Sequence, residues 1–178
     1  MENERYRKYT SSFRMNILTS IANETRNSEF FDCCNLILSG PNPFSRFTKE
    51  GHITASGLVV ENGKVLLIFH SHIKRWLQPG GHIDAGETPI DAAIREVYEE
   101  TGLVCELAAG SCDPLDIDVH IIPSNPSKGE EEHLHIDLLY LLKVVKEGAP
   151  LEEIEFNWFP FDQVKCARIK RALLKLSS

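Results

Sequence analysis

Three glutamates, Glu96, Glu99 and Glu100, stand close together in one segment of the chain. Their spacing of i, i+3 and i+4 places them near one another on a predicted helix, where like charges cost about 0.2–0.5 kcal/mol per pair. A hard divalent cation binds through oxygen ligands and turns this repulsion into binding energy. The spacing therefore predicts a metal site that holds phosphate.

Two glycines, Gly80 and Gly81, precede these glutamates. Glycine lets the backbone approach a ligand closely, and the carbonyl oxygens of such a loop are further ligands for a hard cation. Thr88 and Pro89 suit the start of the helix, and Gly102 suits its end. Helical periodicity predicts an apolar face opposite the carboxylates. The expected members of that face are Ile90, Ile94, Val97 and Thr101.

A second set of candidate ligands lies on two predicted strands, residues 115–122 and 133–145. Side chains alternate along a strand, so every second residue shares a face. The residues on these two faces are Asp116, Asp118, His120, His133, His135 and Asp137. If the strands pair, the set suits an additional transition metal such as manganese, iron, nickel or zinc. It also suits a polar surface that hydrogen-bonds a substrate, and both interpretations stay open.

The composition limits the classes of function. The chain has 178 residues, 42% hydrophobic and 25% charged, which is ordinary for a globular domain with an appendage. The net charge of −7 argues against broad nucleic-acid binding, which needs a basic surface. No apolar run approaches about 18 residues, so we expect no membrane span. Five cysteines without even pairing favour a reducing, cytoplasmic setting.

The pattern of apolar residues changes near residue 50. Helical spacing before this point predicts an N-terminal helical extension over residues 1–49, which either packs against the rest or makes a homodimer contact. Strand-like segments follow at 52–61 and 64–72, joined by Asn62-Gly63, a pair that favours a tight hairpin turn. Further strands are predicted at 104–108, 115–122, 133–145 and 155–159, and a closing helix at about 162–176.

The basic residues of the closing helix are predicted to form its solvated face. They are Lys165, Arg168, Lys170, Arg171 and Lys175.

The segment 81–103 resembles the Nudix box without a mismatch. The matching positions are Gly81, Glu87, Arg95, Glu96, Val97, Glu99, Glu100, Gly102 and Leu103. The strand pair before the box and Trp158-Phe159 before the last helix are also similar to a Nudix domain. The resemblance covers about residues 50–178 and leaves the first 48 unexplained.

This resemblance implies an α/β fold, with a mixed β-sheet sandwiched between helices and residues 50–178 forming a Nudix hydrolase domain. It also implies Mg²⁺ or Mn²⁺ and the hydrolysis of a nucleoside diphosphate linked to another group X. The metal ligands that it implies are Glu96, Glu99 and Glu100, with a carbonyl oxygen of Gly80 or Gly81.

The resemblance further implies that Arg95 orients the glutamates and that Glu87 supports the loop before the helix. Cleaving a P–O–P link with water requires that charge on the phosphoryl oxygens be neutralised and that the water be activated. One glutamate, Glu96 or Glu99, is expected to take the proton of the water.

Two other functions remain as alternatives. One is a non-enzymatic Nudix-like ligand-sensing module, against which the intact box glutamates argue. The other is an enzyme similar to isopentenyl diphosphate isomerases, whose additional cysteine motif is not recognisable here. The expected partner is a small-molecule diphosphate. Its identity stays open because Val119 stands where a proline would suggest ADP-ribose.

Overall fold

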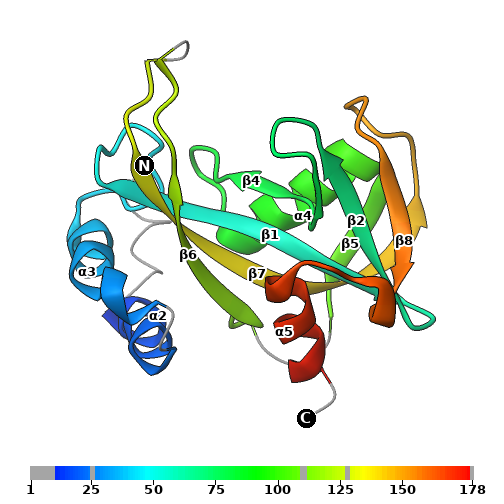
Figure 1. Ribbon diagram of the computed structural model, residues 1–178, viewed down its shortest axis with the longest axis horizontal. Coiled ribbons are helices and arrows are strands. Elements are labelled where there is room, and N and C mark those ends of the chain that lie inside the picture. The colour runs from blue at the N-terminus through cyan, green and yellow to red at the C-terminus, as the bar shows by residue number, and fades with distance from the viewer. Residues whose placement is uncertain (1–10, 25–26, 109–111, 127–128, 177–178) are drawn as a thin grey trace. The chain divides into compact units, whose positions relative to one another are not determined.

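The computed structural model describes residues 11–24, 27–108, 112–126 and 129–176, and its elements are shown in Figure 1. The helices are α2 (Ser11–Asn23), α3 (Phe31–Ser39), α4 (Pro89–Thr101) and α5 (Ala167–Lys175), with short 3₁₀ turns η1 (Ser28–Phe30) and η3 (Phe161–Gln163). The strands are β1 (Gly51–Glu61), β2 (Lys64–His70), β3 (Arg75–Leu77), β4 (Gly80–His82), β5 (Leu103–Leu107), β6 (Asp116–Ile122), β7 (His133–Glu147) and β8 (Phe156–Pro160).

Over these described residues, the strands form one eight-stranded sheet with the order β3-β2-β1-β7-β5. Outside this path, β4 pairs with β1, β6 pairs with β7 and β8 pairs with β2. The predicted α/β fold with a mixed sheet between helices is confirmed.

The chain divides into two compact units. The first consists of Met1–Thr54, His82–Thr88 and Ile117–Asp137. The second consists of Ala55–Gly81, Pro89–Asp116 and Leu138–Ser178. The predicted boundary between residues 49 and 50 stays a prediction, and the first ten residues of the predicted extension lie outside the described residues.

The helices of the first unit pack against each other through their apolar faces. In α2 the buried side chains are Ile17, Leu18 and Ile21, and in α3 they are Cys34, Ile37 and Leu38. The buried Asn27 joins this helical segment to β6. Its amide nitrogen donates to the carbonyl oxygen of Ile117 at 3.2 Å, and its amide oxygen accepts from the backbone N–H of Val119 at 3.4 Å.

The hairpin of β1 and β2 in the second unit is confirmed. Glu61 pairs with Lys64, and Asn62 and Gly63 between them adopt φ angles of 50° and 73°. Positive φ at both central residues is the type I′ turn geometry that an Asn-Gly pair favours.

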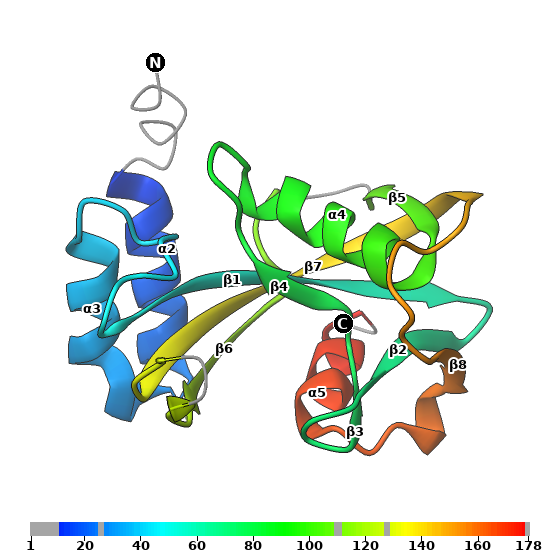
Figure 2. The ribbon, with the colours of Figure 1, turned by 90° about the horizontal axis from the view of Figure 1, so that it is seen from above.

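Two helices of the second unit cover opposite faces of β1. A Cβ atom on Gly57 would lie 2.5 Å from Cγ2 of Val97, so α4 packs closely on the face of Gly57. The neighbouring Leu58 is buried in a cluster that includes Ile169 and Ala172 of α5. Successive side chains of a strand point to opposite faces. Figure 2 shows α4 and α5 on either side of the strands.

The closing helix begins later than the predicted residue 162. The chain first makes η3 and then an extended residue, Val164, whose φ and ψ are −66° and 127°. This conformation places the Val164 side chain in the core with Leu58 and Ile169, so α5 starts only at Ala167. The short strands β3 and β4 were not predicted, and β4 includes Gly80 and Gly81, which were expected in a loop.

Candidate active site and histidine cluster

The carboxylate of Glu100 is buried against the glycine turn. Its Oε2 atom accepts a hydrogen bond from the backbone N–H of Gly80 at 3.1 Å, and the residue is only 7% exposed. A side chain on Gly80 would collide with Ser56 and Ala55 of β1 at 2.5–2.8 Å. The absence of a side chain therefore lets β4 pair closely with β1 and brings the turn to α4.

Glu96 lies directly against the second glycine. A Cβ atom on Gly81 would lie 2.6 Å from Oε1 of Glu96, so a side chain there would displace this carboxylate. Arg95 links two of the glutamates, because its Nη1 atom donates to Oε1 of Glu96 at 2.9 Å and to Oε2 of Glu99 at 3.0 Å. The structure thus places the predicted glutamates, Arg95 and both glycines in one cluster.

Burial disfavours the charged form of these carboxylates. It raises the pKa of Glu100 to about 8, with a further contribution from the charge of Glu96. Burial also raises the pKa of Glu96, although the hydrogen bond and charge of Arg95 oppose the rise. A hard divalent cation prefers oxygen ligands, and it removes the repulsion between buried carboxylates. The glutamates and the neighbouring backbone turn supply such oxygens. The residues present therefore fit Mg²⁺ or Mn²⁺.

The faces of α4 differ from the prediction at several positions. Ile90 and Ile94 are only half-buried, whereas Ala92, Ala93 and Glu100 are buried with Val97 and Thr101. Glycine at 57 brings β1 close to this side of the helix, and small alanines suit that approach better than isoleucines. Glu100 belongs to the buried side because the N–H of Gly80 satisfies its carboxylate.

The helix ends as predicted, at a glycine. Gly102 has a φ of 75°, and its N–H donates to the carbonyl oxygen of Tyr98 at 2.8 Å. In the first unit, Glu87 braces the loop before the helix by accepting a hydrogen bond from the backbone N–H of Asp84 at 3.0 Å. The loop-supporting role expected of Glu87 stays a prediction.

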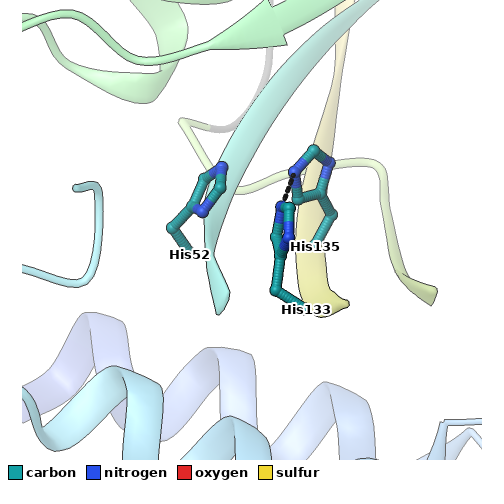
Figure 3. Close-up of side chains that lie close together, drawn as sticks. All are labelled: His52, His133 and His135. Atoms are coloured by element: carbon teal, nitrogen blue, oxygen red, sulfur yellow. Dashed lines mark hydrogen bonds between the residues drawn. The ribbon is translucent and has the colours of Figure 1, made fainter. Parts of the chain in front are cut away.

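Three histidines of the first unit gather at the starts of β1 and β7. Figure 3 shows His52 from β1 facing His133 and His135 from β7. One nitrogen atom from each ring lies within 4.8 Å of the other two, and Nε2 of His133 lies 3.3 Å from Nε2 of His135. Among the described residues these three form a group that could hold a metal ion.

Two more histidines surround this group. The ring centroid of His82 lies 5.0 Å from that of His52, and the centroid of His120 lies 5.7 Å from that of His135. The pairing of β4 with β1 and of β6 with β7 accounts for both contacts. Five of the seven histidines in the chain therefore belong to one cluster.

Burial keeps the rings of His52 and His135 neutral. Burial and, to a smaller extent, the neighbouring histidines together lower the pKa of His52 to about 3 and that of His135 to about 2. The pKa of His82 is also lowered, by burial and then by the charge of Arg46. Neutral imidazole is the form that coordinates metals.

The aspartates predicted for this cluster make other contacts. Asp137 accepts a hydrogen bond from the hydroxyl of Thr54 at 2.8 Å, and Asp118 lies 3.3 Å from Nδ1 of His120. Asp116 belongs to the second unit, where its carboxylate accepts from Arg171 at 2.7 Å and from Lys175 at 2.8 Å. Of the six predicted residues, the structure brings the three histidines together.

The contacts of Asp116 correct part of the predicted solvated face of the closing helix, whereas Lys165 and Lys170 are exposed as predicted. Arg168 is buried, and its Nε atom lies 3.6 Å from the Asp116 carboxylate, so this helix turns three cations toward one buried anion. Burial alone would raise the pKa of Asp116, but the hydrogen bonds of Arg171 and Lys175 lower it.

Sequence reasoning missed His52 and His82 as members of the cluster. A signal existed, because His52 and Thr54 share one face of a strand in the same way as His135 and Asp137. In the structure the ring centroids of His52 and His135 are 4.6 Å apart, and the hydroxyl of Thr54 donates a hydrogen bond to Asp137. Only the pairing of β1 with β7 shows that the two patterns face each other.

Comparison with known proteins gives a match to the NUDIX domain model over residues 51–176. The curated relatives include a Lactococcus lactis protein named "Probable DHNTP pyrophosphohydrolase", 40% identical over 104 residues, 58% of this chain and 61% of the relative. Another is the Escherichia coli K12 protein named "Phosphatase NudJ", 41% identical over 54 residues, 29% of this chain and 35% of the relative. The chain thus matches less than two thirds of the length of these relatives.

Solved structures share the fold. A NUDIX-family hydrolase from Clostridium perfringens has a TM-score of 0.54 at 22% identity and covers 74% of this chain and 98% of its own. A structure described as UDP-X diphosphatase has a TM-score of 0.57 at 15% identity, with 96% of this chain and 93% of its own covered. Among the described helices, none is long and apolar enough to cross a membrane.

Proposed function

The chain belongs to the NUDIX domain family, and from this premise we propose that it is a divalent-metal-dependent hydrolase of a nucleoside diphosphate linked to another group X. The observation that carries the proposal is the burial of Glu100 beside Glu96, with its carboxylate on the N–H of Gly80. A buried carboxylate whose pKa is raised to about 8 is unfavourable in the charged form unless a cation is bound.

Mg²⁺ or Mn²⁺ would be held by Glu96, Glu99 and Glu100, with a backbone carbonyl oxygen of Gly80 or Gly81 as a further ligand. When bound, such an ion neutralises charge on the phosphoryl oxygens and lowers the pKa of a water molecule. Arg95 keeps Glu96 and Glu99 in fixed positions through the two hydrogen bonds from its Nη1 atom.

The proposed reaction is a displacement at phosphorus. The oxygen of water forms a bond to phosphorus, the bridging P–O bond breaks, and its electron pair leaves with the departing phosphate. Glu96 or Glu99 takes the proton of the attacking water. Both side chains are partly exposed, at 14% and 27%, so water can reach them. Glu100 is buried, and its carboxylate accepts a hydrogen bond from the N–H of Gly80.

The names of the relatives support cleavage of a phosphate chain and not one specific substrate. One relative is named as acting on DHNTP and another as a phosphatase. We propose a small molecule as the substrate, and the net charge of −7 argues against a nucleic acid. The five cysteines are free in the structure, which supports the proposed cytoplasmic setting.

A substrate screen with purified protein tests the proposal. Nucleoside triphosphates, nucleotide sugars, dinucleoside polyphosphates, NADH, CoA and DHNTP are each incubated with Mg²⁺ or Mn²⁺, and the phosphate-containing products are identified by chromatography. Turnover of at least one compound is expected, with loss of turnover in EDTA and recovery when the ion is restored. No turnover of any compound with either ion would favour the ligand-sensing alternative.

A further inference from the structure

We propose that His52, His133 and His135 form a binding site for a divalent transition metal of the zinc class. This site is built from imidazole nitrogens of β1 and β7, and the inference does not rest on the proposed hydrolysis. Three features of the group support it: the spacing of the ring nitrogens, the hydrogen bond that orients one ring, and a buried histidine without a hydrogen-bond partner among the described residues.

The spacing of the ring nitrogens is that of ligands on a shared ion. Two nitrogens bound to zinc at about 2.0–2.1 Å in a tetrahedral site lie about 3.3–3.4 Å apart. The Nε2 atoms of His133 and His135 are 3.3 Å apart. The third ring needs only a small movement, because its ligand nitrogen is within 4.8 Å of the other two.

A hydrogen bond fixes the tautomer of His133. Its Nδ1 atom lies 2.8 Å from the backbone carbonyl oxygen of Glu131, which only accepts, so Nδ1 carries the proton and donates it. The lone pair is then on Nε2, the atom that faces His135. Orientation of one ring nitrogen by a backbone carbonyl is the usual outer-shell contact of metal-binding histidines.

His52 lacks a hydrogen-bond partner among the described residues. It is 1% exposed, and neither its Nδ1 nor its Nε2 atom makes a hydrogen bond there. Leaving a buried polar group unpaired is unfavourable, and native proteins satisfy nearly all such groups. Its ring lies 5.3 Å from that of His133 and 4.6 Å from that of His135, centroid to centroid. A metal ion bound by all three rings supplies the missing partner.

The chemistry of the group selects the class of metal. Imidazole suits zinc, copper, nickel and iron, whereas magnesium and calcium prefer oxygen ligands. Three protein ligands leave a fourth tetrahedral position for water or for another donor. His82, with its ring 5.0 Å from that of His52, is a candidate for this donor.

The test uses the full chain purified without a polyhistidine tag and stripped of metal with EDTA. The protein is titrated with Co²⁺ or Zn²⁺ in the presence of excess Mg²⁺, which occupies oxygen ligands. The readouts are the visible ligand-field absorption of Co²⁺ and the Zn²⁺ retained after dialysis. The variants are His133→Gln and His135→Gln. The matched control is His72→Gln, an exposed histidine outside the group.

We expect one equivalent of Co²⁺ or Zn²⁺ in the parent protein and in His72→Gln. Affinity in His133→Gln and His135→Gln should fall by roughly 100-fold, at or beyond the range seen when an outer-shell partner is lost. Circular dichroism checks that each variant is folded, and the half-exposed His133 serves if His135→Gln does not fold.

Three results would overturn the site. They are no bound metal in the parent, unchanged binding in a folded His133→Gln variant, and binding that disappears with Glu100→Gln instead. Hydrolysis is measured separately with Mg²⁺, so its failure leaves this result intact.

Discussion

The glutamates of α4 and the histidines of β1 and β7 both bring like groups together in buried or half-buried positions, but a different physical effect stabilises each arrangement. In the acidic cluster, Arg95 contacts Glu96 and Glu99, whereas Glu100 relies on a backbone N–H. In the histidine cluster, burial removes the charge itself, because it lowers the pKa values of His52 and His135.

The difference bears on what each cluster can bind. Carboxylates are hard oxygen ligands that suit Mg²⁺ and Mn²⁺, and imidazoles suit zinc and its neighbours. A carboxylate cluster that binds a cation also loses an internal repulsion. The neutral rings of His52 and His135 have little repulsion to lose. Metal binding would instead give His52 the partner that it lacks among the described residues. The two clusters should therefore respond to different ions and different variants.

The largest expected effect is on hydrolysis. Glu100→Gln keeps an oxygen acceptor for Gly80 but removes the charge, so turnover with Mg²⁺ should fall roughly 100-fold, which corresponds to about 3 kcal/mol of lost transition-state stabilisation. Steady-state rates on the substrate found in the screen provide the measurement.

The exposed Glu153→Gln is the matched control and should keep the parent rate. If the two variants hydrolyse the substrate equally fast, Glu100 is not a metal ligand. The proposed difference in metal preference between the two clusters would then lack support on the side of the glutamates.

The second effect concerns an aspartate that the sequence assigned to the histidines. Asp116→Asn removes the anion that three basic side chains of α5 contact, including the buried Arg168. Breaking a buried ion pair costs about 3–5 kcal/mol, and the partial exposure of Arg171 and Lys175 should reduce this to about 2–3 kcal/mol. Urea denaturation measures the loss in the free energy of unfolding.

The same variant sharpens the boundary of the histidine site. Co²⁺ affinity should be unchanged in Asp116→Asn under conditions where the protein is folded. If Asp116→Asn binds Co²⁺ more weakly while its stability is unchanged, Asp116 contributes to the metal site after all.

The third effect separates the two neighbouring glycines. Gly81→Ala places a methyl group against the carboxylate of Glu96, the flexible end of a side chain, so the carboxylate should move while the fold persists. We expect Mg²⁺ or Mn²⁺ affinity to fall about 10-fold, the scale of a disturbed metal environment. Binding of Mn²⁺ is followed by electron paramagnetic resonance.

Gly80→Ala serves as the contrasting variant. Its methyl group would collide with Ser56 and with the backbone of Ala55, so it should lower the melting temperature more than Gly81→Ala does. We expect Gly81 to matter mainly for metal affinity and Gly80 mainly for stability. Equal melting temperatures and equal Mn²⁺ affinities for the two variants would contradict this expectation.

The two clusters also differ in how far the sequence predicted them. Glu96, Glu99 and Glu100 lie within five consecutive residues of one helix, and helical geometry alone brings them together. His52 and His135 are 83 positions apart, and their contact depends on which strands of the sheet are neighbours. Local periodicity contains no information about that pairing, so the residues of a single strand were predictable and their partners were not.

The same limit explains the two errors in burial. A helical wheel gives the spacing of an apolar face, but Glu100 is buried because Gly80, twenty positions earlier, donates to its carboxylate. Five basic residues at the closing helix were expected in solvent. Lys165 and Lys170 are exposed, but Arg168, Arg171 and Lys175 contact the buried Asp116 of β6. In both cases a long-range polar partner, absent from any local pattern, decides the burial.

The smallest effect is a pair of opposite pH slopes in the metal-free protein. Burial raises the folded-state pKa of Glu100 from 4.5 to about 8, so the stability that its protonated form confers is lost as the pH rises through about 8. His52 has a folded-state pKa of about 3, below the 6.5 of an ordinary histidine. Its contribution is present above pH 6.5 and is lost as the pH falls toward 3.

Two variants should therefore reduce the pH dependence of the melting temperature, one on the alkaline side and the other on the acidic side. With EDTA present, Glu100→Gln should raise the melting temperature near pH 9 by roughly 2–4 °C, the shift that about 1 kcal/mol produces in a chain of this size. His52→Leu should give a similar rise near pH 5, because it removes the unpaired ring beside His82, His133 and Arg46. Scanning calorimetry across this range measures both, with Glu153→Gln and His72→Leu as exposed controls. If either variant shifts the melting temperature by the same amount near pH 5 and near pH 9, a change in packing explains the shift. Titration of the replaced residue would then not explain the pH dependence.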